Sequence, residues 1–215
     1  MNQEKFDKYL GVLIDEHFTF SNHFDYICNK LNRGLFCINR IKNILNPKAL
    51  LTIYYSIFHS HLLYCNIILS CANNAQIKRI STLQKKAIRA ITKSAYNTHT
   101  APLFNQLKIL PFEKLMLLNR SLFMHSIHYK YQHASFNNIF IQNQHRNTDH
   151  TLRNLENFYL PLPKTEAFKR TTCYLLPKTW NDLPDTIKCQ NNRFTFKIAL
   201  TNEIFHQLEV ENQNL

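Results

Sequence analysis

The sequence contains very little glycine and few other residues that interrupt helices. Among its 215 residues are two glycines, Gly11 and Gly34, and seven prolines. Because glycine and proline are the commonest helix breakers, the long stretches without them favour a mainly α-helical fold. With 45% hydrophobic residues, the chain can bury a substantial core, as one large domain or two small ones. This composition excludes a disordered tail.

Long hydrophobic runs are also absent. No apolar run approaches the roughly 20 residues that a membrane-spanning helix requires. The opening residues, MNQEKFDKYLGVLID, contain neither a hydrophobic signal core nor a small-residue cleavage site. We therefore expect an intracellular protein, nuclear or cytoplasmic, that is not secreted and has no membrane partner. The six cysteines show no C-x-x-C pairing and are expected to be reduced thiols that mostly pack in the core.

The sequence offers no cluster of carboxylates for metal-dependent catalysis. Polymerases and two-metal nucleases hold Mg²⁺ with closely placed carboxylates, whereas this chain has no Asp-Asp pair and its aspartates are scattered. Asp15 follows a β-prone run, where a carboxylate is usually a cap or turn residue. The motifs G-x-x-x-x-G-K-[ST], G-x-S-x-G and H-E-x-x-H are missing as well. We therefore assign no catalytic residue and expect no cofactor in this chain.

Four potential zinc ligands lie close together near the middle of the sequence: His59, His61, Cys65 and Cys71. On a helix, His61 and Cys65 would share a face, but the closely spaced ligand pairs of structural zinc sites are missing. Buried histidines and thiols with local partners are the better interpretation. No metal site is predicted.

Positive charge is what the sequence has in excess. Lysine and arginine number 26 against 14 acidic residues, which gives a formal net charge of +12 and a pI of about 9.5. Such a charge suits a polyanionic partner such as nucleic acid. Within 76–93, apolar residues at helical spacing share one face, and cations occupy the other. The cationic face comprises Lys78, Lys85, Arg89 and Lys93, with Arg79 and Lys86 beside it. The alternative is an ordinary solvated helix surface.

The chain is predicted to consist of five segments. Residues 1–20 contain a short β-prone run, and residues 21–95 read as a bundle of helices over 22–45, 48–70 and 76–93. Asn46 and Pro47 should cap and start the second of these helices, whose almost wholly apolar surface would place it in the middle of the bundle.

The second half of the chain is expected to be less regular. Residues 96–132 form a helical extension, 133–156 a polar linker, and 157–215 a C-terminal tail. Within that tail we expect short strands at 158–160 and 172–175 and a final helix over 194–208.

Several short motifs follow one another in an order typical of a known family. They are Lys8-Tyr9-Leu10-Gly11-Val12, the helix from Asn22 with Lys30 and Arg40, Ile53-Tyr54-Tyr55-Ser56, Tyr64-Cys65-Asn66, Leu83-Gln84-Lys85-Lys86-Ala87-Ile88-Arg89, His99-Thr100-Ala101-Pro102-Leu103-Phe104, Trp180-Asn181-Asp182-Leu183-Pro184 and Phe194-Thr195-Phe196-Lys197. This ordered set resembles the C-terminal part, thumb and tail, of a non-LTR (LINE-type, jockey-like) retrotransposon reverse transcriptase. The sequence departs from the family pattern at Leu69, where tryptophan is common, and at Leu176-Pro177, where Gly-Pro is usual.

The resemblance implies a fold and an incomplete enzyme. It implies a thumb-like helical bundle with a short N-terminal strand, residues 1–20 being the end of the palm, and a small α+β tail. Tyr9, Leu10 and Gly11 would correspond to the primer grip. The catalytic carboxylates and their Mg²⁺ belong to the palm, which would lie upstream. This chain would then be a truncated RNA-directed DNA polymerase, inactive alone, that keeps the thumb for binding primer and template.

Both lines of reasoning predict sequence-independent binding of RNA–DNA hybrid or duplex through backbone phosphates. The predicted binding residues are Lys78, Lys85, Lys86, Arg89 and Lys93, with Lys30, Arg33 and Arg40 as a second group. Trp180 is expected to be a structural anchor rather than a base-stacking platform. The competing hypothesis is a stand-alone helical protein-interaction module that does not bind nucleic acid. A third is that the fragment does not fold alone. The oligomeric state is left open.

Overall fold

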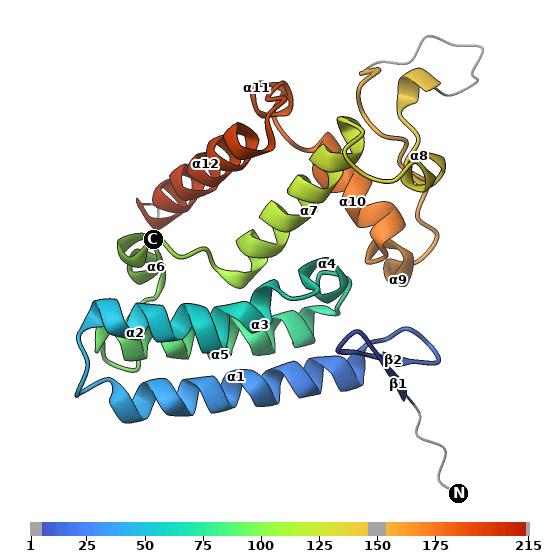
Figure 1. Ribbon diagram of the computed structural model, residues 1–215. Coiled ribbons are helices and arrows are strands. Elements are labelled where there is room, and N and C mark those ends of the chain that lie inside the picture. The colour runs from blue at the N-terminus through green and yellow to red at the C-terminus, as the bar shows by residue number, and fades with distance from the viewer. Residues whose placement is uncertain (1–5, 146–153, 214–215) are drawn as a thin grey trace, which may run out of the picture. The chain divides into compact units, whose positions relative to one another are not determined.

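A computed structural model describes residues 6–145 and 154–213 (Figure 1). The fold is mainly α-helical, as the sequence predicted, and near the N-terminus it has a two-stranded hairpin where a single short strand was expected. The chain divides into two compact units, and each is described by itself below. Unit 1 comprises Met1–Glu113 and Leu208–Leu215, and unit 2 comprises Lys114–Gln207.

Unit 1 begins with an antiparallel hairpin of β1 (Phe6–Tyr9) and β2 (Val12–Asp15). The two-residue turn between them has positive φ at both positions, 46° at Leu10 and 83° at Gly11, which is the backbone of the tight hairpin turns that glycine favours. The β-prone run at 9–14 is therefore not one strand, because its second and third residues make the turn.

Three helical layers follow the hairpin in unit 1. Helix α1 (Ser21–Ile41) packs against both α5 (Asn74–Thr92) and the π-helical turn η1 (Tyr54–His59). The approach to η1 is close at Gly34, where an added Cβ would lie 3.2 Å from the Ile57 carbonyl oxygen and 3.4 Å from the Phe58 ring. Because no side chain fits in that space without a shift of its neighbours, glycine brings the two backbones together.

The predicted helix over 48–70 is interrupted. It consists of α2 (Pro47–Ile53), η1, α3 (Ser60–Leu63) and, after a residue with positive φ at Cys65, α4 (Asn66–Leu69). Asn46 caps α2 as predicted, accepting a hydrogen bond from the Ala49 amide at 2.9 Å. The expectation of all-round burial was wrong. Buried side chains recur every fourth residue, at Leu50, Tyr54, Phe58 and Leu62, whereas Tyr55 and Leu63 are exposed.

Local sequence fixes both ends of α5. Asn73 and Gln76 form a reciprocal capping box at its start, with hydrogen bonds of 2.9 and 3.1 Å. At its end, Lys93 adopts positive φ and the Ser94 amide donates to the Arg89 carbonyl, which terminates the helix. Unit 1 closes with α6 (Ala101–Leu107) and the first residues of α7 (Phe112–His128).

Unit 2 contains most of α7 and the remaining helices. These are α8 (Ser135–Ile139), the short 3-10 turn η2 (Asn143–His145), α9 (Glu166–Lys169), α10 (Thr172–Asn181), α11 (Asp185–Lys188) and most of α12 (Arg193–Gln213). Residues 133–145 and 154–156 of the predicted linker belong to this unit, and the rest of that linker, 146–153, lies outside the described residues.

The two strands expected in the C-terminal tail are not found. Residues 172–175 form the first turn of α10. The side chains that α10 buries recur with helical rather than alternating spacing; they are Leu176, Pro177, Thr179 and Trp180. Phe158 makes only an isolated antiparallel bridge with Gln142. The Asn181 side-chain amide forms hydrogen bonds with both backbone groups of Phe158. Its oxygen accepts from the Phe158 N–H at 2.9 Å, and its nitrogen donates to the Phe158 carbonyl at 2.8 Å. The final helix is present and is longer than predicted.

Candidate nucleic-acid interface

The positive charge of the protein is concentrated in one stretch of unit 1. Residues 26–112 contain 12 lysines and arginines and no aspartate or glutamate. The rest of the chain holds 14 basic and 14 acidic residues, so this stretch accounts for the whole formal net charge of +12. It spans nearly all of α1 and the whole of α2, η1, α3, α4, α5 and α6. A polyanion would therefore meet no carboxylate from the stretch itself, although Asp25 pairs with Arg79 and Glu113 accepts a hydrogen bond from Ser81 Oγ at 3.3 Å.

The exposed face of α5 carries most of the predicted binding residues. Ile80, Ala87, Ile88 and Ile91 are buried, and the opposite side of the helix is exposed at Lys78, Lys85, Lys86 and Lys93. Within the described part of the chain, no ion pair is recorded for these four lysines. Their ammonium groups are therefore strongly hydrated point charges on the surface.

The two arginines of α5 are held by protein groups. Arg79 Nη1 donates to Asp25 Oδ1 of α1 at 2.7 Å, an exposed ion pair. Arg89 Nε donates to the Thr98 carbonyl at 2.9 Å, and its guanidinium carbon lies 5.9 Å from the centre of the Tyr96 ring. Arg89 therefore has a fixed position at the C-terminal end of the helix.

Two grooves run along this side of unit 1, where α5 borders α1. The first, about 450 Å³, is lined by Cys28, Asn32, Ala75, Lys78, Arg79, Thr82, Leu83 and Lys86. The second, about 320 Å³ and called here the Tyr96 groove, is lined by Leu35, Asn39, Lys42, Lys86, Arg89, Ala90, Ser94 and Tyr96. Lys86 lines both, so cations border the α1–α5 side along most of its length.

The second predicted group of cations is not part of these grooves. Lys30 lies 5.4 Å from the Tyr26 ring and Arg40 lies 5.1 Å from the Phe36 ring, all on α1. The charge of Lys30 also contributes, after desolvation, to lowering the pKa of His61 in α3, which places Lys30 toward that helix. Neither these two residues nor Arg33 lines a groove beside α5. Lys42, which the sequence analysis did not select, does.

Gln84 is a structural residue that the sequence analysis missed in the middle of the basic motif. It is buried, and its amide nitrogen donates to Tyr54 Oη and to the Leu110 carbonyl, both at 3.0 Å. Its amide oxygen accepts from the Phe112 N–H at 2.7 Å. Desolvation raises the pKa of Tyr54 despite the hydrogen bond from Gln84. Gln84 thus ties α5 to η1 and to the segment that starts α7. Gln84 lies on the apolar face of α5 between Ile80 and Ile88, and this position in the sequence could have indicated that it is buried.

The hairpin residues predicted to resemble a primer grip lie at the turn. Tyr9 is in β1, Leu10 and Gly11 form the turn, and the Leu10 side chain is 74% exposed. Tyr64 Oη donates to the Leu10 carbonyl. Asp15, at the end of β2, accepts from the amides of His17, Thr19 and Phe20, and these bonds lower its pKa against the opposing effect of desolvation. Asp15 is a turn residue, as predicted.

The group of histidines and cysteines in the middle of the chain does not form a metal site. Among residues 6–145 and 154–213, no three His, Cys, Asp or Glu side chains come close enough to share an ion. His59 is largely buried, and desolvation lowers its pKa. All six cysteines are free thiols, but of these only Cys28 is buried. The expectation that most cysteines pack in the core was wrong.

Trp180 lies at the centre of unit 2 with 0% of its side chain exposed. Its ring stacks on His128 at a centroid distance of 4.8 Å, and the Phe158 and Phe196 rings lie at 6.1 Å. The side chain therefore has no surface on which an external base could stack.

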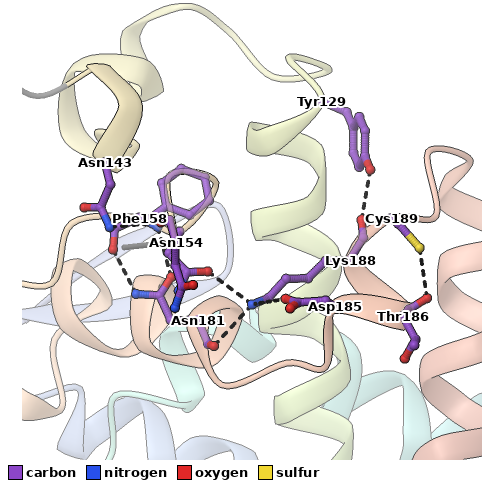
Figure 2. A network of polar contacts seen from close by, with 10 residues as sticks. Tyr129, Asn143, Asn154, Phe158, Asn181, Asp185, Thr186, Lys188 and Cys189 are labelled. Atoms are coloured by element: carbon purple, nitrogen blue, oxygen red, sulfur yellow. Dashed lines mark hydrogen bonds and ion pairs between the residues drawn. The ribbon is translucent and has the colours of Figure 1, made fainter. Parts of the chain in front are cut away.

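Lys188, next to this core, is a buried lysine with polar partners (Figure 2). Its ammonium donates to Asn157 Oδ1 at 3.1 Å and to the Asn181 carbonyl at 3.3 Å, and it lies 3.4 Å from Asp185 Oδ1. Tyr129 Oη donates to the Lys188 carbonyl at 2.9 Å. These bonds satisfy the buried charge, so this network supports the fold of the W-N-D-L-P region rather than a binding site.

Comparison with known proteins gives one match. A stretch of 105 residues, 47% of this chain, is 32% identical to the probable RNA-directed DNA polymerase from transposon X-element of Drosophila melanogaster. The chain spans about an eighth of that relative, since the match covers 12% of its length. No family model and no solved structure matches the chain. The similarity supports a relationship to transposon reverse transcriptases.

Within the described residues, none of the helices combines the length and the hydropathy needed to cross a bilayer.

Proposed function

We propose that this chain binds RNA–DNA hybrid or duplex nucleic acid without sequence preference, as the thumb and tail of a non-LTR, jockey-like retrotransposon reverse transcriptase. The observation that carries the proposal is the acid-free stretch 26–112, whose lysines are exposed along α5. The similarity to a transposon polymerase supports the same assignment.

Phosphate contacts suit the task of a polymerase thumb. A polymerase must accept any template, so its thumb has to hold the duplex by the backbone rather than by base edges. Flexible lysines provide charge without fixed geometry, which favours binding of this kind. Catalysis would need carboxylates and Mg²⁺ from a palm, and the proposal assigns none of these to this chain.

The salt dependence of binding tests the proposal. With about five phosphate contacts, log K against log salt concentration should have a slope of roughly −4, measured by fluorescence anisotropy with a labelled RNA–DNA hybrid. The double variant Lys85→Glu, Lys86→Glu should weaken binding and flatten the slope by about two. A flat salt response of the unchanged protein would contradict the proposal.

A matched control separates location from bulk charge. Lys164→Glu with Lys197→Glu changes the net charge equally, at two exposed lysines of unit 2. We expect this control to retain most of the affinity and the slope. Equal losses in both double variants would show that only net charge matters. A third double variant, Arg33→Glu with Arg40→Glu, should have an intermediate effect, because these arginines lie outside the grooves beside α5.

The second candidate function is a helical protein-interaction module that binds an acidic partner through the basic surface of unit 1. It is favoured by the exposed side chains of Tyr26 and Phe36, which carry cations over their rings. Such a module would show no hybrid binding above background at physiological salt.

A further inference from the structure

The Tyr96 groove differs from the rest of the cationic surface by its chemistry. Its walls bring together three cations, Lys42, Lys86 and Arg89, and the polar side chains of Asn39 and Ser94. One aromatic ring, that of Tyr96, borders it. The volume of about 320 Å³ is at the lower end of the range of about 300–1,000 Å³ for small-ligand pockets.

The loop that carries Tyr96 is held in place, and the Tyr96 side chain is 81% exposed. The loop that carries it follows α5 directly, and three hydrogen bonds fix the loop. The Ser94 amide donates to the Arg89 carbonyl at 3.0 Å, the Thr98 amide donates to the Ala95 carbonyl at 3.1 Å, and Arg89 Nε donates to the Thr98 carbonyl at 2.9 Å. A ring that is so exposed contributes little to the core, so its position beside three cations is free to serve binding.

The chemistry of the groove matches a single nucleotide. An aromatic ring offers a stacking surface to any base, and the neighbouring cations suit the phosphate attached to it. Bases within a duplex are already stacked on their neighbours, so only an unpaired base can use the ring. A duplex alone would use the lysines of α5 and leave the Tyr96 ring without a stacked base.

We propose that the Tyr96 groove binds an unpaired nucleotide, with its base on the Tyr96 ring and its phosphate against Lys42, Lys86 and Arg89. The proposal rests on the proposed function, because it extends the duplex-binding face of α5 to single-stranded nucleic acid at the end of that helix. Arg89 acts as a positioning residue as well as a charge, since it anchors the loop through Thr98.

The test compares two probes on the full chain. One probe is a blunt, fluorescently labelled RNA–DNA hybrid, and the other is the same hybrid with a short single-stranded overhang, made in both polarities. In the unchanged protein we expect an overhang of at least one polarity to tighten binding by about fivefold or more. Tyr96→Ala should remove that gain and leave the affinity for the blunt hybrid unchanged, whereas Tyr96→Phe should keep it.

A fluorescent adenine analogue in the overhang supplies a second readout. Its emission should be quenched on binding if the base stacks on Tyr96, and the quenching should disappear in Tyr96→Ala. Tyr131→Ala, at an exposed tyrosine of unit 2, is the matched control and should leave both readouts unchanged. Circular dichroism of each variant checks that the helices are intact.

The outcomes separate this proposal from the one on which it rests. Salt-dependent binding of the blunt hybrid without any gain from either overhang would overturn the Tyr96 proposal alone. An overhang gain that survives in Tyr96→Ala would overturn it too. Failure of the blunt hybrid to bind would instead remove the proposed function.

Discussion

Units 1 and 2 treat their basic residues differently. In unit 2, three lysines have acidic partners three or four positions away, with Lys169–Glu166 at 2.5 Å, Lys178–Asp182 at 3.2 Å and Lys188–Asp185 at 3.4 Å. Between residues 26 and 112, unit 1 has no acidic residue at all. The pairs of Lys169 and Lys178 are exposed, and exposed pairs contribute little to stability but neutralise a surface locally, whereas Lys188 is buried. The comparison shows that the stretch 26–112 of unit 1 keeps an excess of positive charge that no acidic residue of the same stretch neutralises.

Their cores differ as well. Unit 1 buries aliphatic side chains together with rings such as Tyr54 and Phe58, and the buried Gln84 amide joins three segments. Unit 2 packs rings around Trp180, among them His125 and His128. Because Trp180 is the only tryptophan, its fluorescence reports the unfolding of unit 2, whereas far-UV circular dichroism reports the helices of both units.

The largest effect is expected in the aromatic core of unit 2. Phe196 is fully buried, with its ring 4.4 Å from that of His125, so Phe196→Ala should lower the free energy of unfolding by about 3–5 kcal/mol. Denaturant titration followed by Trp180 emission measures it. Phe194→Ala, at a 70% exposed position of the same helix, is the control and should change stability by less than about 0.5 kcal/mol. An unmoved emission midpoint in Phe196→Ala would contradict the assigned core.

In unit 1, two neighbouring residues of the basic motif should separate stability from binding. Gln84→Leu leaves Tyr54 Oη, the Leu110 carbonyl and the Phe112 amide without the hydrogen bonds of Gln84. We therefore expect the free energy of unfolding to fall by about 2–3 kcal/mol. Circular dichroism during denaturant titration should show it, with the Trp180 transition less affected if the units unfold separately.

Its matched variant is Lys85→Gln, at the next residue, which is exposed. This change should alter the free energy of unfolding by less than about 0.5 kcal/mol. It should also make the slope of log K against log salt concentration for hybrid binding shallower by about one. Loss of binding through Gln84→Leu in a protein that is still folded would refute the division of roles.

The smallest of these effects is a pH dependence in unit 2. Desolvation lowers the pKa of His128 below its ordinary value of 6.5, so the unfolded chain takes up the proton more readily than the folded one. The contribution of His128 to the free energy of unfolding should therefore be complete above pH 6.5 and decrease as the pH falls below 6.5. The Trp180 emission midpoint, measured from neutral to mildly acidic pH, should decrease.

His128→Phe tests whether this histidine is the cause. A phenyl ring can still stack on Trp180 but cannot be protonated, so the pH dependence should be reduced even if the hydrogen bond with Gln142 is lost. His125, whose pKa is also lowered mainly by desolvation, would account for the remainder. An undiminished pH dependence in His128→Phe would place the effect elsewhere.

Sequence periodicity predicted the parts of the candidate interface that depend on one helix. The cationic face of α5 follows from the spacing of its apolar residues, but the helix begins at Asn74, two residues before the predicted start, because Asn73 and Gln76 form a capping box. Periodicity could not show which side of α1 lies beside α5. Lys42, which lines the Tyr96 groove, was therefore missed. Arg33 and Arg40 were predicted to bind nucleic acid, although neither lines a groove beside α5.

Propensity failed where packing overrides it. Residues 172–175 are β-prone, yet the burial of Leu176 and Trp180 in unit 2 favours a helix. The predicted helix over 48–70 missed both η1 and the break at Cys65, which has positive φ and no glycine to indicate it. In both cases the conformation depends on packing against segments that are distant in sequence, and local propensity does not record that packing.

The sequence by itself determined the mainly helical fold, the excess of positive charge and the two faces of α5, because these depend on composition and on contacts one helical turn apart. Only the tertiary structure decided that Gln84 is a buried crosslink while Lys85 is free, and that Trp180 is inaccessible. It also decided that Lys42, Arg89 and Tyr96 share one groove. The physical reason is that burial and proximity are set by side chains from other segments, which no local pattern records.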